Sequence, residues 1–416
     1  MKTLVLDDDP TGTQSAADAL VLLRWDTASL VDALRTRDAV YLLTNTRAID
    51  EAEAVGLLES VRDDLAAVED ELGEPVHVVL RGDSTLRGHV FAETEVFARP
   101  DDLILFVPAF PQGGRTTHDG MHYVRVDGVD VPAHESEYAA DPVFPFASGY
   151  LPDFVRARST RPVVRIPLDD VRAGRLADAV SAAAPGSVLL PDAITDDDLR
   201  AIAGAVRRVW SSGRSVVVRS ASPLAAAIAG VESAGLLPVP LVDAAAPTLL
   251  VCGSHTDGAT RQLARVSERW SAPTPIHTDA ALADAPAEAA RAAAVVARLI
   301  STAGFGALAS ERARRPEHNT LAHGERVMAA LTSAVEALRS DVSVVVSKGG
   351  ITSADVARVG LGADRALVRG QVLPGVSVWD LTTPEGRDLI YVVVPGNVGD
   401  PATIADVLSA LRVPAG

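Results

Sequence analysis

The sequence predicts an α/β protein of two domains, each a largely parallel sheet flanked by helices, with a β-hairpin inserted in the first domain. Short aliphatic and β-branched runs alternate with Ala-, Leu-, Arg- and Asp-rich segments of helical spacing, which is typical of βαβ units. A segment rich in Ala, Pro and Gly interrupts this alternation, which then begins again. The 416 residues, 48% of them hydrophobic, are enough for two cores.

The first half of the chain contains apolar runs that we expect to form a mostly parallel sheet. Segments with helical spacing lie between many of them, such as Ala48–Val68 and Asp196–Trp210. The interval His122–Pro132 alternates apolar and polar residues around an Asp-Gly pair, which predicts a hairpin at the sheet edge or over a cleft. The expected strands are Thr3–Leu6, Val40–Leu43, Val76–Leu80, Leu103–Val107, Val163–Ile166, Val188–Leu190 and Val216–Val218.

A domain boundary is expected near residue 240, which gives domains 1–240 and 241–416. The segment Ala221–Pro247 is mostly uncharged, and its prolines favour an extended connection over a helix. In the second domain the expected strands are Leu249–Cys252, Ala307–Ala309, Val342–Val346 and Leu389–Val394. The expected helices are Ala281–Thr302, Gly324–Leu338, Ser353–Val359 and Thr403–Leu411.

The composition excludes several classes of protein. A formal net charge of −17 and a pI near 4.9 argue against binding nucleic acid or an anionic membrane, because both need a basic surface. The single cysteine, Cys252, cannot form an internal disulfide, which fits a reducing compartment. The start of the chain reads as a strand rather than a signal peptide, and the apolar stretches fall short of the roughly 20 residues of a membrane span. We therefore expect a cytoplasmic protein, and the sequence leaves open whether it is a homo-oligomer.

Polar residues follow four of the expected strands in the first half, at the ends where open α/β sheets bind ligands. These segments are Asp7–Gln14, Thr44–Arg47, Arg81–His89 and Pro108–Gly120. Guanidinium, carboxylate and hydroxyl groups at this density suit a ligand with a carboxylate and hydroxyls, because arginine pairs carboxylates bidentately. The alternative is a set of capped, ion-paired loops with structural roles only.

The histidines His118 and His122 are four residues apart, a spacing that on a helix would suit a metal ion. Gly120 and the preceding turn residues argue against a helix there, so we expect ordinary hydrogen-bonding histidines. The sequence therefore assigns no metal ligand.

Three strand ends in the second half are rich in glycine and hydroxyl groups, as a phosphate site requires. They are Gly253–Thr256, Ser347–Ser353 and Pro395–Gly399, and none is a Walker A motif or a GxGxxG fingerprint. The alternative is that the glycines only allow tight turns. Lys348, one of two lysines in the chain, suits either phosphate neutralisation or a solvated turn.

These segments resemble motifs of the four-carbon acid sugar kinases, a family that includes D-threonate, D-erythronate and 3-oxo-tetronate kinases. In the first half, Asp8–Gly12 is similar to the family's DDxTG, Asp83–Gly88 to its DSTLRG, and Pro108–Thr117 to its PAFP…GRTT block. In the second half, three segments are similar to the family's glycine motifs: Gly253-Ser254, Gly349–Thr352 and Gly396–Gly399. The resemblance spans nearly the whole chain in the expected order.

The resemblance implies an ATP-dependent kinase that, with Mg²⁺, phosphorylates a hydroxyl of a four-carbon sugar acid. It implies that the first domain binds the acid, that the second binds ATP, and that catalysis occurs where they face each other. Carried over residue by residue, the substrate positions are Asp8, Asp9, Arg47, Asp83, Ser84, Thr85, Arg87 and Arg115, with Asp83 and Asp9 as catalytic candidates. The nucleotide positions carried over are Ser254, Gly349, Gly350, Ile351, Thr352 and Gly396, and we add Lys348 and Asn397 as further nucleotide candidates.

The last glycine motif departs from the family pattern, because Val394 and Pro395 stand where the family usually has a lysine. We take as a hypothesis that Lys348 compensates for this lysine. Two alternatives to a four-carbon acid kinase remain at this stage: a kinase of the same fold that acts on another small hydroxy acid, and a non-catalytic sensor of sugar acid or nucleotide. Turnover measured across a panel of substrates tests the first alternative. Calorimetry tests the second, because a sensor would bind its ligand without turnover.

Overall fold

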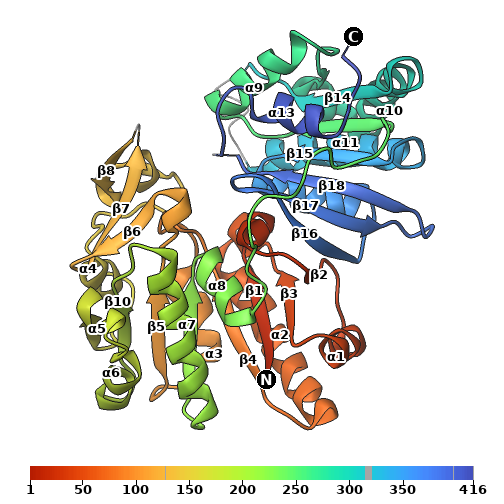
Figure 1. The fold of residues 1–416 in the computed structure, drawn as a ribbon. Helices are drawn as coiled ribbons and strands as arrows, with labels where there is room; N and C mark the ends of the chain where they lie inside the picture. Colours follow the sequence, from red (N-terminus) through yellow and green to blue (C-terminus); the bar gives the residue numbers. More distant parts are fainter. Residues whose placement is uncertain (127, 314–320, 397, 416) are drawn as a thin grey trace. The chain divides into compact units, whose positions relative to one another are not determined.

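The protein is described by a computed structural model that covers residues 1–126, 128–313, 321–396 and 398–415. Its contacts divide the chain into two compact units. The first contains Met1–Leu20 and Trp25–Glu232, and the second contains Val21–Arg24 and the chain from Ser233 onward. Each unit is an α/β structure built on a largely parallel sheet, which confirms the predicted fold class (Figure 1).

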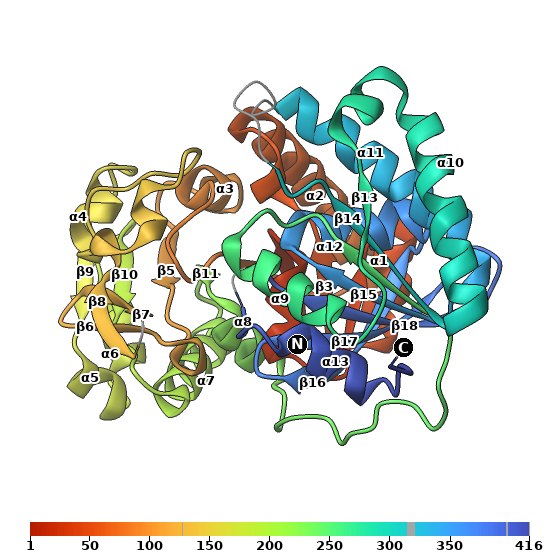
Figure 2. The same cartoon turned by 90° about the horizontal axis from the view of Figure 1, so that it is seen from above.

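The first unit is a parallel sheet with helices on both faces (Figures 1 and 2). Its strands lie side by side in the order β3 (Ala39–Leu43), β1 (Lys2–Asp7), β4 (Val76–Arg81), β11 (Val216–Ser220), β5 (Leu103–Val107), β10 (Val188–Pro191) and β9 (Val163–Ile166). Its helices are α1 (Thr27–Thr36), α2 (Glu51–Leu72), α3 (Val90–Phe97), α4 (Leu151–Arg156), α5 (Leu168–Arg172), α6 (Leu176–Ala182), α7 (Asp196–Ser211) and α8 (Ser222–Ala229). In Figure 2, α2 and α3 lie on one face of the sheet, and α7 and α8 lie on the other.

The strands of this unit are recognisable in the sequence because both faces of the sheet are covered. Every residue of β3 and β5 is buried, so these strands read as continuous aliphatic runs. Two strands end instead in a buried arginine, Arg81 at the end of β4 and Arg219 near the end of β11. These two residues bring charge into the carboxyl edge of the sheet.

The predicted hairpin is present as part of a small antiparallel sheet. Its strands are β6 (Arg115–His118), β7 (Met121–Val126) and β8 (Val129–Pro132), in that order. The β6 strand was not predicted, because its sequence, Arg-Thr-Thr-His, lacks the apolar alternation that signals a strand. Thr117 exchanges backbone hydrogen bonds with Ala193, which attaches β6 to the segment that follows β10.

The second unit has a mixed sheet. Five parallel strands lie in the order β13 (Thr274–Ile276), β14 (Phe305–Ser310), β12 (Thr248–Cys252), β15 (Val344–Lys348) and β18 (Asp388–Val394), and the antiparallel strands β17 (Val376–Thr382) and β16 (Arg365–Leu373) follow. The helices are α9 (Asp257–Ser267), α10 (Thr278–Ala303), α11 (Leu321–Leu338), α12 (Gly350–Asp355) and α13 (Thr403–Ala410). The predicted helix Ser353–Val359 covers the end of α12 and part of a π-helical turn, Val356–Gly360.

A short segment from the start of the chain belongs to the second unit. It is Val21–Arg24, which includes the end of β2 (Ala19–Leu22). The backbone N–H groups of Leu23 and Arg24 donate to the carbonyl of Asp364 at 2.7 and 3.1 Å. This membership was not predicted, because the segment lies between elements of the first unit in the sequence.

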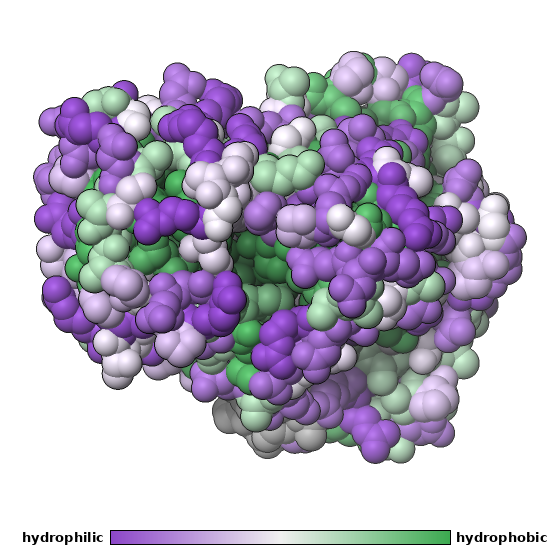
Figure 3. All heavy atoms as spheres, turned by 90° about the horizontal axis from the view of Figure 1, so that it is seen from below, coloured by the Kyte–Doolittle hydropathy of each residue, from purple (hydrophilic) through white to green (hydrophobic). Residues whose placement is uncertain are grey.

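Hydrophilic side chains cover most of the molecular face shown in Figure 3. Within the described parts of the chain, no helix has both the length and the hydropathy needed to cross a bilayer.

Candidate functional site

The carboxyl ends of β1, β4 and β11 bring the polar segments of the first unit together. Asp7 is in register with Arg81 on β4, and Arg81 is in register with Ser220 on β11. Residues from segments far apart in the sequence therefore meet at one edge of the sheet, where open α/β folds bind ligands.

The buried layer at this edge consists of five charged residues. Arg81 Nη1 lies 3.0 Å from Asp7 Oδ1 and 3.1 Å from Asp8 Oδ1. Arg219 Nη2 lies 3.6 Å from Asp8 Oδ2, and Arg219 Nη1 pairs with Glu93. All five side chains are between 1% and 3% exposed, so this layer supports the edge from within.

An outer layer covers this network and is partly exposed to solvent. Arg47 pairs with Asp9 through one nitrogen and lies 3.4 Å from Asp83 Oδ1 through the other. Asp83 Oδ2 accepts hydrogen bonds from Thr85 Oγ1 and from Arg87 Nε, the latter at 2.8 Å. The exposed fractions are 9% for Asp83, 15% for Arg47 and 23% for Arg87, so the two guanidiniums are the accessible charges of the cluster.

The outer carboxylates are held in the ionised form. Burial alone would raise the pKa of Asp9, but the charges of Arg47 and Arg81 outweigh it and lower that pKa below its ordinary value. Burial is likewise outweighed at Asp83, where Arg87 and Arg47 lower the pKa of the carboxyl. Both groups therefore accept hydrogen bonds without carrying a proton at neutral pH.

The inner carboxylates behave in the opposite way. Burial raises the pKa of Asp7 to about 7, against the opposing charge of Arg81. Burial also raises the pKa of Asp8, although Arg47, Arg81 and Arg219 oppose it. The edge thus combines two permanently ionised carboxylates with two that hold a proton more readily.

Several buried polar atoms of the inner layer lack hydrogen-bond partners among the described residues, and two of them are Asp8 Oδ2, an acceptor, and Arg219 Nη2, a donor. They face each other at 3.6 Å, beyond hydrogen-bonding distance. A Cβ atom at Gly88 would lie 3.4 Å from the first and 3.5 Å from the second. A hydroxyl or a water beside Gly88 would satisfy both, because it can accept from the guanidinium and donate to the carboxylate.

His122 connects the antiparallel sheet to the loop that follows β4. Its Nε2 is 2.8 Å from the Ser84 carbonyl, so this nitrogen carries the proton, and its Nδ1 is 3.0 Å from Thr117 Oγ1. The ring is fully buried, and burial lowers its pKa to about 4. His122 is therefore a neutral hydrogen-bonding residue, as predicted, that fixes the Ser84 backbone.

The remaining predicted substrate residues lie around the same loop. Thr85 is fully buried and Ser84 nearly so. Arg115, at the start of β6, donates to the Gly113 carbonyl and forms no ion pair with the acidic cluster within the described chain. The structure thus brings Asp8, Asp9, Arg47, Asp83, Ser84, Thr85 and Arg87 together, whereas Arg115 lies near enough to act on His122 but is not paired with them among the described residues.

Two buried residues of the network, Arg219 and Glu93, were absent from the sequence prediction, and Arg81 was predicted only as part of the polar segment Arg81–His89. An arginine inside an otherwise aliphatic run is the available signal, and both arginines carry it. Glu93 gives no such signal, because it lies in the first turn of α3, where acidic residues are ordinary.

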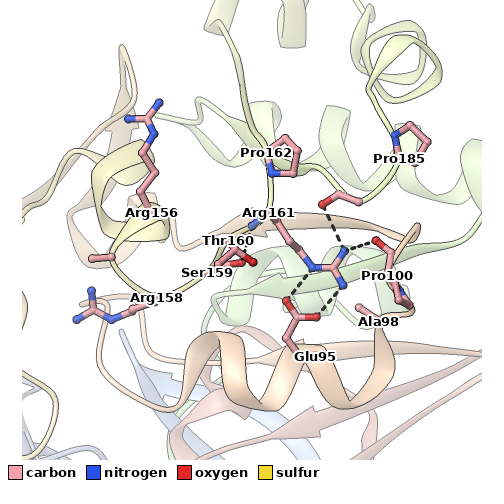
Figure 4. Close-up of a pocket in the computed structure, with 12 residues that line it drawn as sticks. Glu95, Ala98, Pro100, Arg156, Arg158, Ser159, Thr160, Arg161, Pro162 and Pro185 are labelled. Carbon is pink, nitrogen blue, oxygen red and sulfur yellow. Dashed lines mark hydrogen bonds and ion pairs between the residues drawn. The ribbon is translucent and has the colours of Figure 1, made fainter.

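A pocket in the first unit lies at the opposite, amino-terminal edge of the sheet (Figure 4). Of the three arginines that line it, Arg161 binds Glu95 through Nε and Nη2, at 2.7 Å each. Arg161 Nη1 donates to the carbonyls of Pro100, Asp102 and Gly186. Because these donors are already used within the protein, Arg161 joins the segments that precede β5, β9 and β10 rather than binding a ligand.

The three glycine loops of the second unit meet at the carboxyl ends of β12, β15 and β18. A Cβ atom at Gly253 would lie 2.2 Å from Thr352 Oγ1, so any side chain there would displace Thr352. A Cβ atom at Gly396 would lie 3.5 Å from Ser254 Oγ and 3.9 Å from Gly349 Cα. The loops therefore approach one another at backbone distance, which leaves their surface to N–H groups and hydroxyls.

Lys348 lies beneath these loops and is not the solvated turn residue that the sequence allowed. Its side chain is fully buried, and its amine donates to the carbonyls of Pro395 and Val398 at 2.6 and 3.1 Å. Lys348 is in register with Val394, so its amine lies under the loop in which the family lysine is missing. Burial lowers the pKa of Lys348 to about 8.

The other predicted nucleotide residues line the same junction. Gly350 begins α12 and Ile351 is 49% exposed, whereas Thr352 is buried. Ser254 Oγ lies 3.3 Å from Thr256 Oγ1, which caps α9 through the N–H of Ala259. Asn397 lies outside the described residues. Within the described chain, no three His, Cys, Asp or Glu side chains form a group that could hold a metal ion.

Comparison with known proteins matches two domain models to this chain. Residues 3–228 match the model of a sugar-binding N-terminal domain, and residues 249–404 match that of a nucleotide-binding C-terminal domain. A D-threonate kinase of Salmonella typhimurium is 27% identical over 98% of both chains. A D-erythronate kinase of Heliobacterium modesticaldum is 30% identical over 64% of this chain and 61% of its own length.

Solved structures share the fold. One from Haemophilus influenzae has a TM-score of 0.65 and 19% identity, and it covers 98% of this chain and 99% of its own. One from Salmonella typhimurium has a TM-score of 0.71 and 19% identity, and it covers 97% of this chain and 98% of its own. At this identity the likeness concerns the fold alone.

Proposed function

This chain belongs to the four-carbon acid sugar kinase family, and on that premise we propose that it transfers the γ-phosphoryl group of ATP to a hydroxyl of a four-carbon sugar acid. Threonate, erythronate and 3-oxo-tetronate are the substrates to test first. The observation that carries the proposal is the outer layer of Arg47, Arg87, Asp9 and Asp83 at the open edge of the first unit.

Arg87 and Arg47 are the proposed ligands of the substrate carboxylate. Arg87 Nε is held by Asp83 and Nη1 lies 3.5 Å from Asp141, whereas Nη2 has no hydrogen-bond partner among the described residues. An arginine whose one nitrogen is fixed by a carboxylate while another stays open is oriented in advance for an anionic ligand. The proposed site therefore needs little reorganisation to accept an acid.

Asp83 and Asp9 are the proposed partners of the substrate hydroxyls. Because both stay ionised at neutral pH, each accepts a hydrogen bond and can orient the attacking hydroxyl or receive its proton. A weakly basic carboxylate suffices in phosphoryl transfer, where positioning and charge stabilisation dominate. The unpaired atoms of Asp8 and Arg219 offer a second hydroxyl position beside Gly88.

The glycine loops of the second unit are the proposed nucleotide site. Their backbone distances leave room for phosphate oxygens to approach N–H groups, and Ser254 and Thr256 add hydroxyls. We propose Mg²⁺ as the companion of ATP, where it would supply charge neutralisation to the phosphates. The chain's own contribution is to bind and orient the nucleotide. We also propose a cytoplasmic location, where ATP is available.

The test is an ADP-release assay with purified protein, ATP and Mg²⁺ across a panel of three- to six-carbon acids. The proposal expects turnover with at least one four-carbon acid and little with the others. Turnover confined to a different hydroxy acid would favour a kinase of the same fold with another substrate. Binding of acid and nucleotide by calorimetry without ADP release across the panel would contradict catalysis and favour a sensor.

A further inference from the structure

Lys348 brings a positive charge into the second unit without a carboxylate to balance it. Its side chain is fully buried, and the partners of its amine are the carbonyls of Pro395 and Val398. Within the described chain no carboxylate forms an ion pair with it. A buried charge without a counter-ion is costly, so such a residue either loses its proton or meets an anion.

Arg312, a second cation, acts on the same loops. Its Nη1 donates to the Ser254 carbonyl at 2.6 Å, and its Nη2 donates to Thr260 Oγ1 at 2.8 Å. Its Nε is buried and has no partner among the described residues. Both cations act on Cys252 at the end of β12, where burial raises the pKa of the thiol and the charges of Arg312 and Lys348 oppose that rise. Two cations therefore flank the loop that follows β12.

Lys348 and Arg312 both bind the backbone of the glycine loops from within the second unit. Each is hydrogen-bonded to a backbone carbonyl of a glycine loop, which orients carbonyl oxygens inward. Lys348 holds two carbonyls of the loop after β18, at Pro395 and Val398, on either side of Gly396. A loop whose carbonyls point toward a buried amine can direct its N–H groups toward the other side, where an anion would bind.

We propose that Lys348 is the internal counter-charge of the nucleotide phosphates, and that it positions the loop after β18 from beneath. The inference rests on the proposed function, because it assigns a role within the proposed nucleotide site. It places Lys348 as a positioning residue whose charge is balanced only when phosphate is bound.

The consequence is a coupling between nucleotide binding and the ionisation of Lys348. Without nucleotide, burial lowers the pKa of the amine to about 8. The neighbouring elements carry titratable and charged groups that include Cys252 on β12, His255 after β12, Tyr391 on β18, Asp355 on α12, Asp400 after β18 and Arg312 after β14. Of these groups, Cys252 is the one whose charge acts on the amine. A bound phosphate favours the ammonium, so nucleotide binding raises the lysine pKa and takes up a proton above pH 8.

The composition makes this coupling measurable, because Lys2 and Lys348 are the only lysines in the sequence. Protein labelled with ¹³C at lysine Cε gives two signals, and Lys2→Met assigns them without disturbing the second unit. The chemical shifts are followed against pH without ligand and with saturating ADP and Mg²⁺, which cannot be turned over. We expect the Lys348 midpoint near pH 8 without ligand and at least one pH unit higher with ADP, while Lys2 stays unchanged.

An unchanged Lys348 midpoint while calorimetry shows that ADP is bound would overturn this inference and leave the proposed kinase intact. Equal shifts at both lysines would also overturn it, because they would report a general effect of the nucleotide. Absence of ADP binding would overturn the proposed function, and the inference with it.

Two variants extend the test to affinity. A rise of one pKa unit corresponds to a tenfold difference in binding between the charged and neutral forms, so Lys348→Met should weaken ADP binding at least tenfold at pH 7. Lys348→Arg keeps the charge permanently and should bind ADP without proton uptake. Lys2→Met is the matched control and should bind ADP as the parent protein does. Unweakened ADP binding by a folded Lys348→Met protein would contradict the proposal.

Discussion

Replacing Asp83 with Asn removes the carboxylate that lies between Arg47 and Arg87. Removing one partner of a buried ion pair costs about 3–5 kcal/mol, because the remaining charge stays buried without compensation. Arg87 is 23% exposed and can be hydrated in the variant, so we expect the free energy of unfolding to fall by a smaller amount, about 2–3 kcal/mol. Urea denaturation at pH 7 measures this difference.

The same substitution should also lower turnover. Asn keeps the shape of the side chain but neither holds both arginines nor receives a proton. Loss of a group that orients or deprotonates the attacking hydroxyl typically costs about 10²–10⁴ in rate, so kcat/KM in the ADP-release assay should fall by at least a hundredfold. The acid binding constant, measured separately by calorimetry, shows how much of the loss is substrate binding.

The pH dependence supplies an independent check on Asp83. Its pKa is lower in the folded protein than in the unfolded chain, so its contribution to stability is present above the ordinary aspartate pKa and is lost as the pH falls. The Asn variant should lack this part of the acid sensitivity. The matched control is Asp63→Asn, which removes a pair with Arg62 in which Asp63 is 72% exposed, and it should cost less than about 1 kcal/mol. An Asp83→Asn protein as stable and active as this control would refute the assigned role.

Three further predictions concern other parts of the two sites. The pKa of Asp7 is raised to about 7, so its contribution to stability is present below pH 4 and is lost as the pH rises through 7; Asp7→Asn should remove this loss in thermal unfolding followed from pH 4 to 8. Replacing His122 with Ala frees the Ser84 carbonyl and should raise KM for the acid about tenfold with a smaller change in kcat, whereas an equal change in both would contradict a positioning role. Gly253→Ala should weaken nucleotide binding at least tenfold, because its methyl group would lie 2.2 Å from Thr352 Oγ1; Gly56→Ala, which meets no atom within 4 Å, is the control and should bind nucleotide normally.

The sequence revealed most of the parallel strands because burial on both faces turns them into aliphatic runs, but it missed the three-residue strand β13. The antiparallel strands β16 and β17 escaped the prediction for the opposite physical reason. Charged residues such as Arg369 and Asp380 alternate with apolar ones along them and pair across the two strands at 2.7 Å. Partly exposed strands of this kind lack the continuous apolar run that marks the other strands.

The sequence predicted those residues of the candidate site that lie in short polar segments directly after strands. Asp9, Asp83 and Arg87 lie in short polar segments after strands, and the structure brings them together. The pair of Arg219 and Glu93 joins residues 126 positions apart, and no local pattern reports such a contact. Lys348 shows the same limit, because a lysine after a strand reads as solvated until the loop that covers it is known.

The early segment Val21–Arg24 limits how completely the second unit can fold before synthesis of the chain is nearly finished. The N–H groups of Leu23 and Arg24 donate to the carbonyl of Asp364. Because Asp364 is synthesised about 340 residues later, these two N–H groups stay hydrated during most of translation. The second unit therefore cannot complete its hydrogen bonding from its own contiguous stretch, and a fragment that begins at Ser233 would expose this edge. Limited proteolysis should find such a fragment less resistant than the same unit in the intact chain. Residues near the start of the chain thus complete their hydrogen bonds only with a residue near its end.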